Sequence, residues 1–235
     1  MSYEEFLEWC DEDTLAEWVD GEVVMTSPAS RKHQMVVVFL TNLLSAFVEL
    51  RGLGVVLSAP FQMKLRNGRE PDLMYVAREH VGRLKETYLD GPADLAVEVV
   101  SPESGGRDRG DKFYEYAEGG VREYWLIDPQ ARWGEFYHLL EGHYRPAFSG
   151  REGVYRSAVL PGFWLRVEWL WQEPMPSADE VLFEIGGDDY VRRQLEIGGE
   201  EYVRRLIKVG GEAYARLLIE QLRKHGWLPV DEGRS

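Results

Sequence analysis

Two acidic side chains lie in stretches of sequence that are typical of buried β-strands. Asp72 follows a proline, and Glu98 lies in the apolar run from Leu95 to Val100. In a strand, Glu98 shares one face with Ala96 and Val100, so it is the single polar group on an apolar surface. A buried ionised carboxylate costs several kcal/mol unless something pairs with it. The charge of two such carboxylates in one core must therefore be compensated by a cation, by pairing of the two carboxylates or by a shared proton.

A lysine further along the chain can reach these carboxylates. The segment Arg107–Ala117 predicts a helix, and Lys112 lies about two turns into the element that leaves the Glu98 strand. Its long aliphatic stem can reach back to the end of that strand. Asp72, Glu98 and Lys112 can therefore converge on one site.

A purely structural interpretation is open for each of the three residues. Asp72 can be a turn or capping residue, because Pro-Asp pairs are common in loops. Glu98 can be a strand residue that faces solvent. Lys112 can be a surface lysine that pairs with Asp108 one helical turn earlier.

Four stretches of the sequence together resemble one family of proteins. They are Pro71-Asp72, the strand that ends in Glu98–Pro102, the charged run Arg107–Lys112 and the strand Glu123–Pro129. This combination is similar to the Uma-two-type restriction endonuclease family of the PD-(D/E)XK nuclease superfamily. The resemblance covers roughly residues 15 to 170.

The resemblance implies a fold, a cofactor and a set of site residues. The fold is a restriction-endonuclease-like α/β domain with a mixed sheet and flanking helices. Asp72, Glu98 and the backbone carbonyl of Val99 are expected to bind Mg²⁺ or Mn²⁺. The superfamily lysine usually stands two residues after the second acid, where this chain has Val100. Lys112 is therefore assigned the catalytic role of that lysine.

Two further residues are supporting candidates for the site. His33 begins a long predicted helix, at a place where the family tends to carry a histidine. Glu22 follows the Asp20-Gly21 turn and is a weaker candidate for a further acidic ligand. The structural alternatives are an exposed histidine at a helix start and a surface residue of a hairpin.

The charge of the chain restricts how it can contact nucleic acid. The 235 residues carry a formal net charge of −14 at pH 7, which argues against broad nucleic-acid binding over the whole surface. A local basic patch is required instead, with DNA the favoured partner. Three basic runs could supply it, and solvated surface charge explains each of them equally well: Arg31–His33, Lys64–Arg66 with Arg69, and Arg107 with Arg109.

Cysteine content and hydropathy suggest a cytoplasmic protein. The single cysteine, Cys10, excludes an internal disulfide and a cysteine-based zinc site. The first residues lack the basic and apolar regions of a secretion signal. The longest apolar helix is interrupted by polar residues, so we expect neither secretion nor a membrane span.

The order of elements predicts a central sheet with helices on its faces. A hairpin over residues 15–25 precedes a helix from about Arg31 to Leu50, which Gly52 ends. Strands are then expected in a mixed α/β order, with antiparallel strands added at the end. The segment His80–Asp90 is expected to be a loop over the sheet. The predicted strands are 55–57, 61–65, 72–76, 95–100, 124–127, 135–140, 143–146 and 163–167.

The C-terminal part of the chain is repetitive. From Glu184 onward, a Gly-Gly pair followed by an acidic pair or residue and a tyrosine recurs with a period of 12 residues. Paired glycines weaken a helix interior, so we expect three short helices separated by these pairs. We therefore divide the chain into a nuclease-like domain over residues 1–175 and a helical tail over residues 176–235. The tail is expected to pack on the domain or to form a homo-oligomer, either a dimer or a tetramer.

Two functional hypotheses follow. The first is a metal-dependent endonuclease that hydrolyses phosphodiester bonds of nucleic acid, with DNA favoured. The second is a catalytically idle nuclease-like module that binds or assembles through its C-terminal repeats. The acidic composition favours the second hypothesis, and the resemblance favours the first.

Overall fold

A computed structural model describes residues 1–10, 14, 16–25, 29–101, 106, 109–186 and 190. The chain divides into two compact units, Met1–Met175 and Pro176–Ser235. In the second unit, residues 178–186 are helical and Tyr190 donates a hydrogen bond to the carboxylate of Asp179. The rest of the predicted repeat tail lies outside the described residues.

The first unit begins with a capped helix and a small sheet. Ser2 and Glu5 form a capping box at the start of α1 (Tyr3–Trp9). Strands β1 (Ala16–Val19) and β2 (Glu22–Met25) form the expected antiparallel hairpin. Its sheet has the order β2-β1-β5-β4-β7, which adds the strands β5 (Gly68–Arg69), β4 (Gln62–Lys64) and β7 (Tyr88–Asp90).

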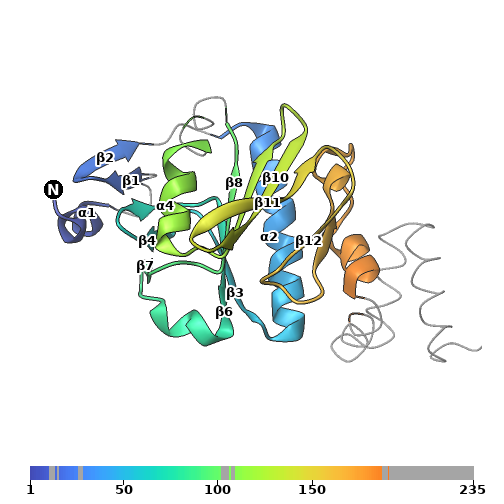
Figure 1. The fold of residues 1–235 in the computed structure, drawn as a ribbon, viewed down its shortest axis with the longest axis horizontal. Helices are drawn as coiled ribbons and strands as arrows, with labels where there is room; N and C mark the ends of the chain where they lie inside the picture. Colours follow the sequence, from blue (N-terminus) through green and yellow to red (C-terminus); the bar gives the residue numbers. More distant parts are fainter. Residues whose placement is uncertain are drawn as a thin grey trace, which may run out of the picture. The chain divides into compact units, whose positions relative to one another are not determined.

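A six-stranded mixed sheet forms the centre of the same unit (Figure 1). All neighbouring strands are antiparallel except β8 and β9, which run parallel. In sheet order the strands are β11 (His143–Gly150), β10 (Trp133–Leu140), β9 (Glu123–Asp128), β8 (Leu95–Val99), β6 (Leu73–Ala77) and β3 (Gly54–Ser58).

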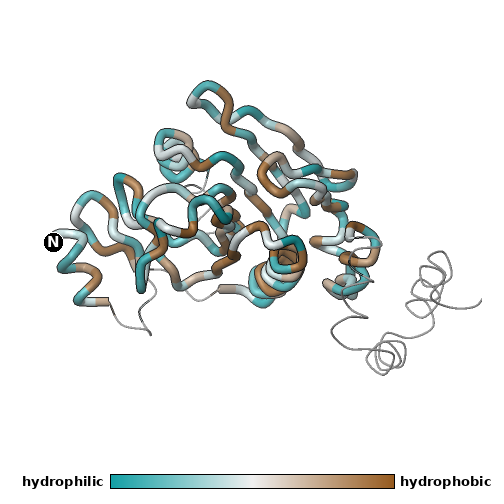
Figure 2. The backbone as a smooth tube through the Cα atoms, turned by 90° about the horizontal axis from the view of Figure 1, so that it is seen from below, coloured by the Kyte–Doolittle hydropathy of each residue, from teal (hydrophilic) through white to brown (hydrophobic). Residues whose placement is uncertain are grey.

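Two helices cover opposite faces of this sheet. The helix α4 (Asp111–Gly119) packs Tyr116 against one face, where Ala96 of β8 also belongs to the core. On the other face, Phe163 contacts both Trp125 of β9 and Phe47 of the helix α2 (Arg31–Arg51). Figure 2 looks along both helices and shows the strands between them.

The long helix α2 has local signals at both ends. The Ser30 side chain accepts a hydrogen bond from the backbone of His33, and Gly52 ends the helix with a left-handed φ of 59°. Among the described residues, α2 is the one helix whose length and composition would allow it to cross a membrane. Its apolar side is buried in the domain core, including Val36, Leu40 and Phe47, so it is a core helix here.

The segment expected to be a loop over the sheet contains regular structure. Residues Arg78–Arg83 form the 3₁₀ helix η1, and Tyr88–Asp90 form β7, which pairs in parallel with β4. The prediction of a loop over His80–Asp90 was therefore wrong in part. Three residues carry too little periodicity to identify a strand.

A second hairpin and a 3₁₀ helix complete the first unit. Strands β12 (Val154–Arg156) and β13 (Trp164–Arg166) pair in an antiparallel manner, and η2 (Val167–Trp171) follows them. The buried carboxylate of Glu123 accepts hydrogen bonds from the hydroxyls of Tyr155 and Ser157. This carboxylate therefore ties the last part of the unit to β9.

Candidate active site

Asp72 and Glu98 come from neighbouring strands at one end of the central sheet. In the antiparallel pair of β6 and β8, Leu73 lies opposite Val97, so the next residues in register are Asp72 and Glu98. The backbone N–H of Val99 donates a hydrogen bond of 2.7 Å to Oδ2 of Asp72. The predicted acids and the predicted backbone ligand are therefore adjacent in the structure.

Glu98 is a buried acceptor for two side chains of α4. Only 4% of Glu98 is exposed. Its Oε1 accepts a hydrogen bond of 3.0 Å from the Lys112 ammonium and one of 2.7 Å from the Tyr116 hydroxyl. Because these donors are four residues apart, they lie on one face of α4. The structure thus brings the predicted lysine to the predicted acid.

The structure adds an acidic residue that the sequence analysis missed. Glu17 of β1 is 2% exposed, and its Oε1 lies 2.9 Å from Nζ of Lys112. The Lys112 ammonium therefore lies between Glu17 and Glu98, at nearly equal distances from both. Lys112 itself is 6% exposed, so the three charged groups share a site with little access to solvent.

Glu22 is not part of this cluster. It pairs with Val19 beside the hairpin turn, and its side chain is exposed. Glu17 and Glu22 belong to the same face of the hairpin, but Glu17 is further from the turn and reaches the buried interior. The signal available in the sequence was a single glutamate among apolar residues of the predicted hairpin, between Ala16 and Trp18.

Arg69 contacts the carboxylate oxygen of Glu17 that Lys112 does not contact. Its guanidinium lies 3.3 Å from Oε2 of Glu17 and 2.7 Å from Oε2 of Glu115. The backbone and side-chain amides of Asn67 also donate to Glu115. Arg69 is 3% exposed, so it cannot contribute to a basic patch for nucleic acid, contrary to one of the alternatives considered from the sequence.

Charge and burial shift the pKa of several groups here. Burial raises the pKa of Glu17, but the Lys112 ammonium and the Arg69 guanidinium outweigh it, so the net pKa lies below the usual value. Burial and the charge of Glu17 raise the pKa of Glu70 to about 7, although Lys112 opposes this effect. Burial and the charge of Glu98 raise the pKa of Tyr116, which keeps its hydroxyl a donor.

His33 contacts Asp72 from α2. Its Nε2 lies 3.3 Å from Oδ1 of Asp72, and the residue is 8% exposed. The sequence alternative of an exposed histidine is therefore wrong. Asp72 holds a position between the backbone of Val99 and the imidazole of His33, with 22% of its side chain exposed.

The donor chemistry of the site suits a hard divalent cation. Asp72 and Glu98 supply carboxylate oxygens from adjacent register positions, and Val99 supplies a backbone carbonyl at the same strand end. Oxygen ligands of this kind are those that Mg²⁺ prefers. Within the described residues, no group of three or more His, Cys, Asp or Glu side chains is arranged as a metal site. A cation here would therefore depend on two carboxylates and the backbone.

The fold is similar to that of a solved structure. A crystal structure described as "a putative nuclease belonging to DUF820" from Anabaena variabilis has the same fold, with a TM-score of 0.63 and 14% identity. The match covers 73% of this chain and 97% of that chain.

The chain belongs to the Uma2 family, whose description is "Putative restriction endonuclease". The family model matches residues 3–168, which is more than half of the chain. This match confirms the resemblance inferred from the sequence. No curated protein matches the chain.

Proposed function

We propose that this protein is a metal-dependent endonuclease that hydrolyses phosphodiester bonds of DNA. The observation that supports this most is the position of the Lys112 ammonium between Glu17 and Glu98, beside the adjacent carboxylate of Asp72. Family membership supports the same class of function. The metal dependence, the substrate and the residue roles are parts of the proposal.

Asp72, Glu98 and the carbonyl of Val99 would hold one or two Mg²⁺ or Mn²⁺ ions. When bound, a divalent cation polarises a scissile phosphate and increases the acidity of a water molecule. Contacts with neighbouring groups hold the two carboxylates in place, which supports this proposal. The backbone of Val99 and the imidazole of His33 orient Asp72, and the Tyr116 hydroxyl orients Glu98.

Lys112 has two roles in the proposed site. Its ammonium compensates the charges of Glu17 and Glu98, which allows two carboxylates to stay ionised in a buried environment. The same ammonium can orient the attacking water or stabilise negative charge that develops on the phosphate. Glu17, held by Arg69, keeps the ammonium at this position.

Cleavage of plasmid and oligonucleotide DNA with Mg²⁺ or Mn²⁺ tests the proposal. Asp72→Asn and Glu98→Gln should each reduce the cleavage rate by about 100-fold or more, because each removes a charged metal ligand. Glu118→Gln is the matched control, since Glu118 is an exposed carboxylate on α4. Equal rates for wild type and Glu98→Gln would refute the assignment.

An idle binding or assembly module is the second candidate, favoured by the net charge of −14. Calorimetric titration with Mn²⁺ separates the two. An enzyme of the proposed kind binds the metal in the wild type and loses that binding in the Asp72→Ala/Glu98→Ala double variant. An absence of metal binding and of cleavage in the wild type would favour the module.

A further inference from the structure

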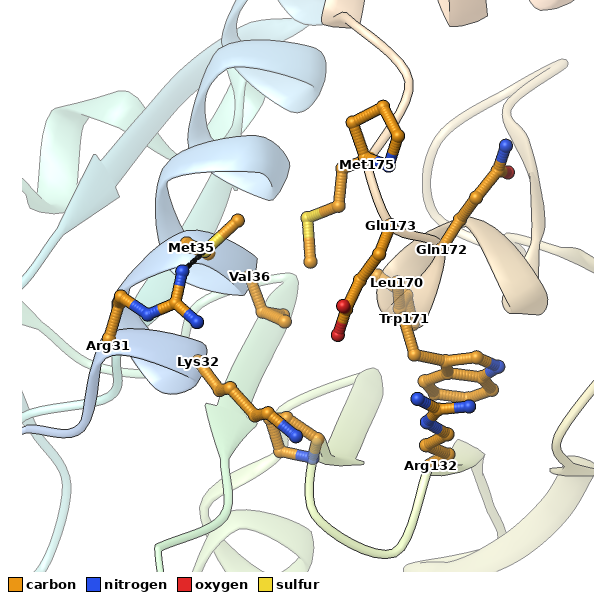
Figure 3. Close-up of a pocket in the computed structure, with 12 residues that line it drawn as sticks. Arg31, Lys32, Met35, Val36, Arg132, Leu170, Trp171, Gln172, Glu173 and Met175 are labelled. Atoms are coloured by element: carbon orange, nitrogen blue, oxygen red, sulfur yellow. Dashed lines mark hydrogen bonds between the residues drawn. The ribbon is translucent and has the colours of Figure 1, made fainter.

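A cavity of about 230 Å³ lies at one end of the first unit, outside the carboxylate and lysine cluster. One wall is the first turns of α2, with Lys32 and Val36. The opposite wall is η2 and the residues after it, with Trp171 and Glu173, and the β9–β10 turn closes one side with Arg132 (Figure 3).

The cavity adjoins the proposed active site. Lys32 immediately precedes His33, whose imidazole contacts Asp72. Pro129, also in the cavity wall, follows β9, in which Ile127 pairs with Val99 beside the site. The cavity and the carboxylates therefore share the start of α2 and the same end of the central sheet.

Three cations line this cavity: Arg31, Lys32 and Arg132. In the part of the chain that the structure describes, none of them lies within ion-pair distance of a carboxylate. Among the described residues, the Arg31 guanidinium donates a weak hydrogen bond to the sulfur of Met35, at 3.8 Å. In a chain with a net charge of −14, three such cations around one cavity favour an anionic occupant.

Arg132 occupies a backbone position that suits glycine better. Its φ is 52°, in the left-handed region that residues with a side chain seldom adopt. The side chain is exposed, so packing of the core does not require arginine there. A strained residue beside a cavity is a reason to look for a functional role of its side chain.

The remaining lining indicates an occupant with an aromatic ring. A cavity of about 150 Å³ accommodates benzene, so this cavity has room for a nucleic-acid base. Trp171 offers apolar surface on one wall, and the carboxylate of Glu173 points between the walls (Figure 3). A carboxylate in this position accepts a hydrogen bond from an exocyclic amino group, as acidic side chains do from cytosine.

We propose that this cavity binds one unpaired nucleotide of the DNA substrate, next to the scissile phosphate. The base stacks on Trp171, its amino group donates to Glu173, and Lys32 and Arg132 contact the flanking phosphates. A base enters such a cavity only when it is unstacked, so single strands or unpaired junctions are the preferred substrates. This inference rests on the proposed nuclease function.

Fluorescence anisotropy with labelled deoxyoligonucleotides in EDTA tests binding without cleavage. Trp171→Leu should weaken the binding of single strands by about 5- to 150-fold, which is the range for loss of one base–aromatic stack. Arg132→Gly suits the φ of 52°, so it removes the cation without backbone strain. Arg132→Gly and Lys32→Gln should each reduce the slope of log affinity against log salt by about 0.7.

Arg145→Gln is the matched control. Arg145 is exposed on the edge strand β11, away from the residues that line the cavity, so its replacement should leave the salt slope unchanged.

Cytidine strands should bind more tightly than thymidine strands, and equal affinities would refute the role of Glu173. If wild type cleaves DNA but Trp171→Leu binds and cleaves as wild type does, only the cavity assignment is wrong. Duplexes binding as tightly as single strands would also overturn it. If wild type neither binds nor cleaves DNA, both proposals fail.

Discussion

Replacement of Lys112 by methionine should destabilise the protein in a pH-dependent way. The ammonium is buried and contacts Glu17 at 2.9 Å and Glu98 at 3.0 Å. Removal of one partner from a buried ion pair typically costs about 3–5 kcal/mol. Here Glu17 keeps Arg69, and Glu98 keeps the Tyr116 hydroxyl, so we expect the lower value, about 3 kcal/mol.

The sign of the pH dependence follows from the pKa of Glu17. That pKa is lowered in the folded protein, so the stability it contributes is present above the ordinary glutamate value of about 4.3. This contribution is lost as the pH falls through the lowered pKa. Without the ammonium, less charge opposes the effect of burial, so the pKa of Glu17 is higher in the variant than in wild type. The variant then takes up protons at higher pH, and the difference from wild type shrinks as the pH falls.

Urea unfolding in EDTA, followed by tryptophan fluorescence, measures this effect. Trp125 is fully buried in the first unit and reports on its unfolding. The free energy of unfolding of Lys112→Met should fall short of wild type by about 3 kcal/mol at pH 7, and by less at about pH 5. Lys85→Met is the control, because Lys85 is exposed. A deficit below about 1 kcal/mol at pH 7, or an equal deficit at both pH values, would contradict the reasoning.

Three further predictions concern other parts of the chain. Glu123→Ala should lower the free energy of unfolding by at least about 3 kcal/mol, measured by urea unfolding, because it leaves the hydroxyl donors of Tyr155 and Ser157 and the backbone N–H of Ala158 without their acceptor. The pKa of Glu70 is raised to about 7, so the free energy of unfolding of wild type should fall as the pH rises from about 4.3 to that value. Glu70→Gln, measured in EDTA, should reduce this fall, and an unchanged pH profile of the free energy of unfolding would contradict the prediction. The C-terminal repeats are expected to drive homo-oligomerisation, so truncation after Glu184 should reduce the number of subunits per particle in sedimentation velocity, and an unchanged number would contradict this role.

The sequence predicted the elements that depend on local patterns. The end of α2 was predicted from a single residue, Gly52, which adopts a left-handed conformation there. Glu98 was placed on the face of Ala96 because a strand alternates its side chains, and the structure agrees, since both face α4. Short-range geometry was sufficient for these features.

The partners of the buried charges could not be predicted in this way. Arg69 was considered as a possible phosphate contact, yet it is buried between Glu17 and Glu115, which lie 52 and 46 positions away in the sequence. The residue type alone does not distinguish an exposed arginine from one that is buried and paired with carboxylates inside the fold. Only the packing of β1, β5 and α4 against one another makes that distinction.

The position of Glu17 makes the N-terminal hairpin part of the proposed site. Glu17 comes from the five-stranded sheet, Glu98 comes from the six-stranded sheet, and the Lys112 ammonium joins them. The hairpin is held in turn by Arg69 and by the Asn67 side chain, which accepts a hydrogen bond from the backbone of Asp20. A displacement of the hairpin would remove Glu17 from the Lys112 ammonium and leave its contact with Glu98. The geometry of the proposed catalytic lysine is therefore coupled to the docking of an element that is far from it in sequence.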